Sequence, residues 1–220
     1  MSRFDAPADR EVSTTAIVLA AGAGSRFRDI GHKLSARLPA SNDRPAESVA
    51  DRSIATAIAA RLGTVVVVTG RLSAVELGLD EADDPDDGDR NGAAVTTVHN
   101  PSWQDGQMTS VRTGLDVARA RGSTVAVIGL ADQPGIEATA WRAVASSATA
   151  VTPIAVAVYG DRRANPVALH HSVWDLLPSE GDEGARSLMR LHPALVREVP
   201  CTGSPTDIDT AEDLRRWQNN

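Results

Sequence analysis

Residues 14–26 read TTAIVLAAGAGSR, an uninterrupted apolar run that ends in two glycines, a serine and an arginine. A continuous apolar run of this length is typical of a β-strand that is buried on both faces of a sheet. Two glycines directly after such a strand allow a turn in which free backbone N–H groups can surround an anion. The segment therefore predicts a parallel strand that leads into a ligand-binding turn.

Further apolar runs rich in valine have the same character. They cover residues 64–69, 124–130 and 153–159, and weaker ones cover 94–99 and 194–200. Helical patterns separate them, at residues 51–62, 107–120, 138–145, 172–177, 183–191 and 210–217. Strands that alternate with helices indicate a mostly parallel sheet with helices on both faces. We expect an α/β protein.

Length and composition are those of a chain that can form its own core. The 220 residues are 42% hydrophobic and 23% charged, which is ordinary for a globular protein. No segment approaches the roughly 18 apolar residues of a membrane span, and residues 1–13 lack the apolar centre of a secretory signal. The single cysteine, Cys201, excludes an intramolecular disulfide. We expect a cytoplasmic protein without a membrane partner, with a flexible tail over residues 1–13 and one domain over residues 14–220.

The net charge of −7 arises from one segment. The chain has 29 acidic and 22 basic residues, and seven of the acids lie within residues 80–89, where no base stands. Without that segment the two signs balance. The acidic run is expected to be a solvated loop or hairpin tip. A neutral body lacks the basic face that broad nucleic-acid binding needs, so no nucleic-acid partner is expected.

Two cations follow the glycine turn. Arg26 and Lys33 lie on the connection after the first strand, and Lys33 is the single lysine beside 21 arginines. An ammonium group is a compact point charge that can follow a phosphate. The segment lacks the closing G-K-[ST] of a P-loop and the third glycine of the dinucleotide fingerprint. It predicts a polyphosphate site of another kind, with a plain glycine-rich turn as the alternative.

Ligands of an open α/β sheet bind at the carboxyl ends of the strands. Asp132 follows the run at 124–130 within the segment Ala131-Asp132-Gln133-Pro134. An acid at such a place is costly unless it meets a cation or hydrogen-bond donors. Mg²⁺ is commonly held by one or two carboxylates together with substrate phosphates. Asp132 is therefore a candidate ligand of Mg²⁺, with a structural turn acid as the alternative.

Six motifs, in order, resemble those of the nucleotidyltransferases, and most closely those of the molybdenum cofactor cytidylyltransferases and their MobA-like relatives. They are LAAGAGSRF at 19–27 with Lys33-Leu34, N-P-x-W-x-x-G-Q-x-x-S at 100–110, LADQP at 130–134, NPV at 165–167, G-D-x-G-A-R at 181–186 and D-I-D-T-x-x-D-L at 207–214. The resemblance implies a three-layer Rossmann-like fold of the GT-A type. It also implies transfer of CMP from CTP to a phosphorylated acceptor, a molybdopterin-type cofactor, with release of pyrophosphate.

The resemblance, together with the places of these residues after the strands, implies roles for single side chains. Arg26, Lys33 and Asp132 would be catalytic, and Asp132 would hold Mg²⁺ with Asp209 or Asp207. The nucleotide would contact Leu19, Ala20, Ala21, Gly22, Gly24, Ser25, Thr69, Gly70, Asn100, Gly106 and Ser110. The second substrate would contact Asn165, Asp182 and Arg186. An acceptor phosphate is already ionised at neutral pH, so the reaction would need positioning and charge stabilisation rather than a general base.

Alternatives stay open for three of these residues. Ser110 could contact a base edge or cap the start of a helix. Asp209 could hold the metal or cap the last helix, and Arg186 could meet an acceptor phosphate or pair with a neighbouring acid.

The function also has alternatives. One is a guanylyltransferase that acts on molybdopterin or on a phospholactate-type acid, and another is a sugar-phosphate enzyme. The residues between Arg26 and Lys33 depart from the family pattern, so a third is a nucleotide- or cofactor-binding protein that no longer turns over. A recipient molybdoenzyme would be a further partner.

Overall fold

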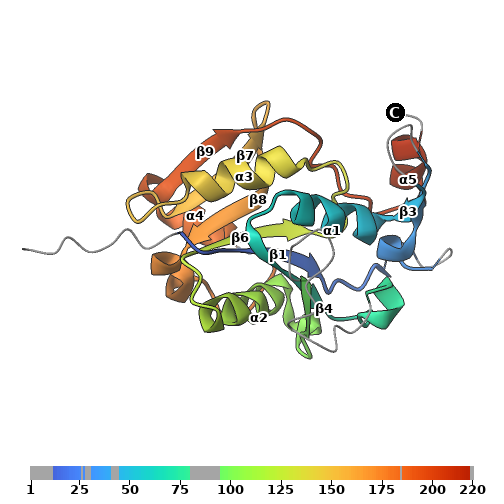
Figure 1. Cartoon of the computed structure of the whole chain (residues 1–220), viewed down its shortest axis with the longest axis horizontal. Helices are drawn as coiled ribbons and strands as arrows, with labels where there is room; N and C mark the ends of the chain where they lie inside the picture. The colour runs from blue at the N-terminus through green and yellow to red at the C-terminus, as the bar shows by residue number, and fades with distance from the viewer. Residues whose placement is uncertain are drawn as a thin grey trace, which may run out of the picture.

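The computed structural model describes residues 12–25, 27, 31–40, 45–79, 95–183 and 185–218. Its centre is a seven-stranded sheet in the order β5-β4-β1-β6-β8-β7-β9 (Figure 1). The strands are β1 (Thr14–Ala20), β4 (Gly63–Thr69), β5 (Val95–His99), β6 (Val125–Leu130), β7 (Ile154–Tyr159), β8 (Arg162–His170) and β9 (Val196–Pro200). A second, two-stranded sheet pairs β2 (Arg37–Leu38) with β3 (Glu47–Ser48).

The main sheet is mostly parallel, as the apolar runs predict. β1 pairs in parallel with β4 and β6, β4 with β5, and β7 with β9, whereas β8 is antiparallel to both of its neighbours. All six predicted strands are present within one or two residues of their expected ends. β8 was not predicted, because its first residues are polar and Pro166 interrupts the pattern.

Helices cover both faces of the sheet, which confirms the predicted three layers (Figure 1). The α-helices are α1 (Val49–Ala59), α2 (Gln107–Ala120), α3 (Ala138–Ser147), α4 (Arg186–Leu191) and α5 (Ala211–Gln218). The 3₁₀ helices are η2 (Lys33–Ser35), η3 (Val75–Leu77), η4 (Trp103–Asp105), η5 (His171–Leu176) and η6 (Pro193–Leu195). The helix predicted at 172–177 is thus 3₁₀, and that predicted at 183–191 begins only at Arg186. In the described residues no helix is long and apolar enough to cross a membrane.

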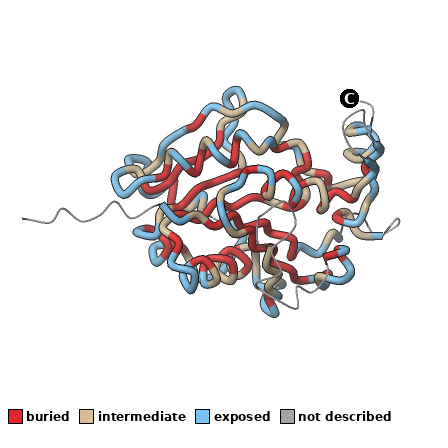
Figure 2. The backbone as a smooth tube through the Cα atoms, in the orientation of Figure 1, coloured by how far each residue is buried: buried red, intermediate tan, exposed pale blue. Residues whose placement is uncertain are grey.

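Alternate residues of β1 belong to two hydrophobic clusters on opposite faces of the sheet. Ala16 and Val18 pack with α1 and α3, whereas Ile17 and Leu19 pack with α2. Figure 2 shows the resulting band of buried residues along the central strands. Burial on both faces is the reason that this strand is apolar without alternation.

The parallel register brings four strand ends to one edge of the sheet. Ala20 lies beside Thr69, Leu19 beside Leu130, and Thr69 beside His99. The loops that follow β1, β4, β5 and β6 therefore leave the sheet side by side. This edge is the place where the sequence predicts the ligand.

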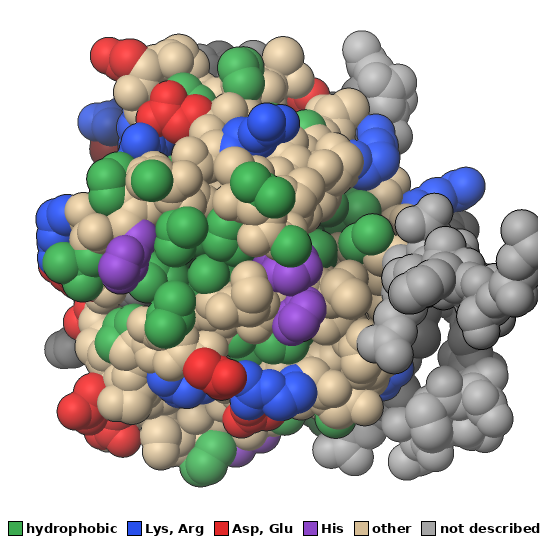
Figure 3. All heavy atoms as spheres, turned by 90° about the vertical axis from the view of Figure 1, so that its left-hand side faces the viewer, with side chains coloured by type: hydrophobic (Ala, Val, Ile, Leu, Met, Phe, Trp, Pro, Cys, Tyr) green, Lys and Arg blue, Asp and Glu red, His purple; other side chains and the backbone are tan. Residues whose placement is uncertain are grey.

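The opposite end of the sheet, where β1 and β6 begin, carries several hydrophobic side chains among polar ones (Figure 3). Figure 3 shows hydrophobic side chains and histidines gathered on that face. A cavity of about 660 Å³ opens there beside α3, and its described lining contains Arg142 and His170 but no acidic side chain. It offers no carboxylate for a metal ion.

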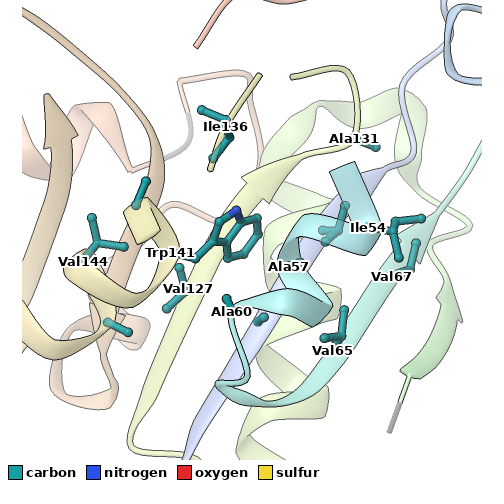
Figure 4. Packing of buried hydrophobic residues seen from close by; sticks show 14 of the residues in the cluster. Ile54, Ala57, Ala60, Val65, Val67, Val127, Ala131, Ile136, Trp141 and Val144 are labelled. Atoms are coloured by element: carbon teal, nitrogen blue, oxygen red, sulfur yellow. The ribbon is translucent and has the colours of Figure 1, made fainter. Parts of the chain in front are cut away.

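Trp141 of α3 lies across β6 at Gly129, in the middle of the cluster that α1 and α3 share (Figure 4). A Cβ atom added at Gly129 would lie 2.4 Å from Cζ2 of Trp141. The glycine therefore allows an aromatic ring to contact the strand directly, and it fixes the distance between α3 and the sheet.

We expect Gly129→Ala to lower the free energy of unfolding by about 1–3 kcal/mol, because the added methyl group overpacks the contact with Trp141. Denaturant unfolding measures this difference. The same substitution in a Trp141→Phe background, where the outer ring atoms are gone, should cost less. Equal costs in both backgrounds would contradict the proposed clash.

Candidate active site

The ammonium group of Lys33 lies between two carboxylates at the carboxyl edge of the sheet. Lys33 Nζ donates to Asp132 Oδ2 at 2.5 Å and to Asp209 Oδ1 at 2.6 Å. The side chains of Lys33 and Asp132 are each 14% exposed, and that of Asp209 is 24% exposed. Three charges therefore share one partly dry position, where they interact more strongly than in water.

The two acids raise the pKa of Lys33. Burial acts against the charge of the ammonium group, but the attraction and hydrogen bonds of Asp132 and Asp209 outweigh it and raise the pKa above its ordinary value of 10.5. Lys33 is thus a fixed cation at neutral pH. Its charge compensates the acids that the sequence predicts as metal ligands.

Each member of this cluster is placed by a buried neighbour. Asp132 follows β6, where Ala131 N donates to Leu19 O at 3.0 Å. Ile208 is 1% exposed, and its N–H donates to Asp132 O at 2.9 Å, so the segment that carries Asp209 is held against Asp132. Leu34, 3% exposed, anchors η2 and hence Lys33.

The last helix has its own cap. Thr210 Oγ1 accepts from Asp213 N at 3.1 Å, and Asp213 Oδ2 accepts from Thr210 N at 2.9 Å. This is a capping box at the start of α5. The cap is complete without the carboxylate of Asp209, the alternative cap considered above, and that carboxylate accepts from Lys33 instead.

Asp132 retains an unused oxygen. Its Oδ1 is buried and has no hydrogen-bond partner among the described residues. A buried carboxylate oxygen without a partner is costly, and a bound cation would remove that cost. Within the described part of the chain, however, no group of three Asp, Glu, His or Cys side chains is arranged as a metal site. The arrangement fits a metal ion that takes two protein carboxylates and completes its shell with substrate oxygens.

Asp207 belongs to a neighbouring network. Its Oδ1 accepts from Gln133 Nε2 at 2.7 Å, and Gln133 Oε1 accepts from Asn165 Nδ2 at 3.2 Å. Burial, followed by the charge of Asp132, raises the pKa of Asp207, against the lowering effect of the bond from Gln133. Gln133 therefore links the segment after β6 to Asn165 in β8 and to Asp207.

A cavity of about 380 Å³ opens in front of Lys33 and Asp132. Nine of the predicted site residues line it: Leu19, Ala20, Ala21, Gly22, Lys33, Gly106, Ser110, Asp132 and Asp182. Ala23, which belongs to the predicted turn, also lines it, and the remaining lining residues, which the sequence did not single out, are Leu34, Trp103, Gln104, Gln107 and Leu130. Trp103 and Gln107 lie inside the N-P-x-W-x-x-G-Q motif, so the motif itself could have indicated them.

Ser110 lines this cavity, and Asn100 lies behind it. Asn100 Nδ2 donates to Ser110 Oγ at 2.9 Å and to Thr109 Oγ1 at 2.8 Å, and both Asn100 and Ser110 are buried. The helix-cap alternative for Ser110 is wrong, because α2 begins at Gln107 and its N-cap is Gly106. Ser110 is instead held by Asn100 at the cavity wall.

Asp182 lies at the start of α2. Its Oδ1 accepts from Gln107 N at 3.1 Å, and Gly181 O accepts from Met108 N at 2.9 Å. A Cβ atom at Gly106 would lie 2.7 Å from the carbonyl of Gly181, so this approach requires the glycine. Gly181 and Asp182 thus accept hydrogen bonds from the first backbone N–H groups of α2, at the boundary between this cavity and a second one.

The second cavity, of about 470 Å³, shares Gln107 and Leu130 with the first. Asn165 and Arg186 line it, as does Arg163, above an apolar floor that includes Ile128 and Val167. Arg190 on its rim pairs with Glu183 at 2.9 Å. The cavity combines positive charge with an apolar surface.

The structure does not bring every predicted residue to these cavities. The first cavity's lining does not include Gly24, Ser25, Thr69, Gly70, Asn100, Asp207 or Asp209. Gly70 is in close contact with the first turn, where an added Cβ atom would lie 2.7 Å from Ala21 O. Arg26 lies outside the described residues, as does the acidic segment 80–89.

Residues 16–198 match the family of MobA-like NTP transferase domains. A search of curated proteins finds no match. Among solved structures, Rv0371c from Mycobacterium tuberculosis H37Rv is 25% identical with a TM-score of 0.70, over 95% of this chain and 98% of that one. The structure of Rv0371c in complex with manganese is 25% identical with a TM-score of 0.66, over 94% of this chain and 99% of that one. A nucleotidyl transferase from Methanothermobacter is similar in fold, with 20% identity and a TM-score of 0.72 over 94% and 96% of the two chains.

We expect Lys33→Met to lower the free energy of unfolding at pH 7 by about 1–3 kcal/mol, because it leaves Asp132 and Asp209 without their common cation. The pKa of Lys33 is raised on folding, so the stabilisation is complete below 10.5 and is lost as the pH rises through the higher folded value. The difference from wild type should therefore shrink above about pH 10.5.

Denaturant unfolding over a pH series checks this expectation. Asp209→Asn added to Lys33→Met should recover part of the loss, because it removes one of two facing negative charges. A difference from wild type that grows at alkaline pH would be inconsistent with the ion pairs.

Proposed function

Because the chain belongs to the family of MobA-like NTP transferase domains and is therefore a nucleotidyltransferase, we propose that it transfers CMP from CTP to a phosphorylated acceptor. The acceptor is a molybdopterin-type cofactor, and pyrophosphate is the second product. The observation that carries this proposal is the Lys33 ammonium group held by Asp132 and Asp209 at the mouth of a cavity that begins at the glycine turn.

The first turn binds the triphosphate. Gly22 and Ala23 are exposed and line the cavity with Lys33. Backbone N–H groups in such a turn favour anions, and Lys33 adds a full positive charge. Arg26, which follows in the sequence, supplies a second cation in this proposal. Together these groups stabilise the charge of the β- and γ-phosphates as pyrophosphate leaves.

A divalent metal ion supplies the remaining positive charge. We propose that Mg²⁺ binds to Asp132 and Asp209, and bound Mg²⁺ neutralises charge on the phosphates. The unpartnered Oδ1 of Asp132 supports this assignment. Asp209 is favoured over Asp207 because it shares Lys33 with Asp132, whereas Asp207 is hydrogen-bonded to Gln133.

The two cavities suit two substrates. The base of the nucleotide lies toward Asn100, Gly106 and Ser110, and the resemblance of the N-P-x-W motif favours cytosine. The acceptor lies in the second cavity, where Asn165 and Arg186 contact it above the apolar floor. Because Leu130 and Gln107 line both cavities, an acceptor phosphate would meet the α-phosphate at their junction.

Thermal shift with CTP, GTP, ATP and UTP, each with and without Mg²⁺, tests the proposal. A ligand at a hundredfold excess over its dissociation constant stabilises the folded state by ~2.7 kcal/mol, so a specific nucleotide should be visible. We expect stabilisation by CTP that requires Mg²⁺ and is lost in Asp132→Asn. Stabilisation by GTP alone would indicate a guanylyltransferase.

Turnover is tested separately by release of pyrophosphate with CTP and molybdopterin-type acceptor. We expect release from wild type and none from Asp132→Asn. Tight binding of CTP without release would indicate a binding protein that lacks turnover.

We also expect Lys33→Met to bind Mn²⁺, without nucleotide, about tenfold more tightly than wild type. The reason is that the ammonium group of Lys33 holds the two carboxylates that the metal needs. Titration followed by electron paramagnetic resonance measures free Mn²⁺ directly. Asp209→Asn should bind Mn²⁺ more weakly than wild type, and equal affinities in all three proteins would contradict the assigned ligands.

A further inference from the structure

His32 connects the glycine turn to the helix that carries Lys33. It is the N-cap of η2, and its Nδ1 accepts from Leu34 N at 3.3 Å. On the other side of the ring, Nε2 lies 3.2 Å from Gly22 O. The imidazole ring therefore connects its own short helix to a carbonyl group ten residues earlier in the sequence.

These two partners determine the protonation of the ring. An amide N–H can only donate and a carbonyl oxygen can only accept, so Nδ1 must be unprotonated and Nε2 must carry the proton. Burial lowers the pKa of His32, and the positive charges of Lys33 and Arg71 add to this effect, against the bond to Gly22. A neutral ring with its proton on Nε2 is consistent with both contacts.

The ring also rests on Gly24. A Cβ atom at Gly24 would lie 2.7 Å from His32 Nε2, and the φ angle of Gly24 is +59°. A side chain at this position would displace the ring and strain the backbone. Gly24, the second glycine of the turn, is thus required both by the close contact with the His32 ring and by its positive φ angle.

The consequence concerns the two groups on either side of the ring. Gly22 lines the cavity in front of Asp132, and Lys33, the residue after His32, holds Asp132 and Asp209. His32 thereby links the backbone of the glycine turn to the short helix that carries the Lys33 ammonium group. Without the ring, the turn would keep its glycines but lose the contact that sets its distance from Lys33.

We propose that His32 is a positioning residue, which holds the glycine turn in the conformation that binds the phosphates of the nucleotide. This inference rests on the proposed function, since it assumes that phosphates bind at the turn. It assigns His32 no contact with the reacting atoms. Its effect should therefore appear in the affinity for the nucleotide rather than in the rate of the chemical step.

Three substitutions separate the two hydrogen bonds. Gln can place an amide nitrogen where Nε2 lies, Asn can place an amide oxygen where Nδ1 lies, and Ala removes both groups. We expect His32→Ala to raise KM for the nucleotide about tenfold with kcat within about twofold of wild type. His32→Gln should restore KM to within about threefold of wild type, and His32→Asn should not. His171→Ala, at the opposite end of the sheet, is the control and should leave KM unchanged.

A measurement without nucleotide keeps this inference distinct from the proposed function. The ¹⁵N chemical shifts of the His32 ring should show a protonated Nε2 and an unprotonated Nδ1. Hydrogen exchange at the amides of residues 22–25 should be faster in His32→Ala than in wild type. Failure of wild type to bind any nucleotide would overturn the proposed function and this inference with it. Unchanged KM in His32→Ala, equal rescue by Asn and Gln, or a loss confined to kcat would overturn the role of His32 alone.

Discussion

One partly buried cation between two carboxylates holds together three segments that lie far apart in the sequence. Lys33 Nζ lies within 2.6 Å of a carboxylate oxygen of both Asp132 and Asp209, so one positive charge attracts two negative ones at a partly buried position. The neighbouring structure serves to bring these three groups together. β6 ends at Leu130, two residues before Asp132, η2 begins at Lys33, and buried Ile208 fixes the segment that carries Asp209.

The same three charges explain why the site suits a triphosphate with its metal ion. In the structure, Lys33 offsets one of the two negative charges of Asp132 and Asp209. If a metal ion bound to Asp132 and Asp209, as we propose, the ammonium group of Lys33 would be available to an anionic substrate at the glycine turn. The cation that attracts the two acids in this structure would then attract phosphates.

The sequence predicts most of this fold because parallel strands buried on both faces are continuous apolar runs, as in residues 14–20. It does not predict β8, where polar residues and Pro166 hide the pairing. Motif resemblance indicates Lys33 and Asp132, but the contacts of His32 with Gly22 and of Gln133 with Asp207 become visible only in the folded chain. A lone histidine such as His32 has no characteristic spacing that would point to a role.

Lys33 is separated from Asp132 by 99 residues and from Asp209 by 176 residues. To form such long-range contacts the chain must close long loops, which costs conformational entropy before the contacts can stabilise the fold. During synthesis, the N-terminal half can emerge with its glycine turn and its lysine, yet the cluster stays incomplete until the last helix approaches. A ribosome-bound chain that ends between residues 133 and 208 would therefore hold Lys33 and Asp132 without Asp209, and the cluster of three charges would form only after residue 209 has been added.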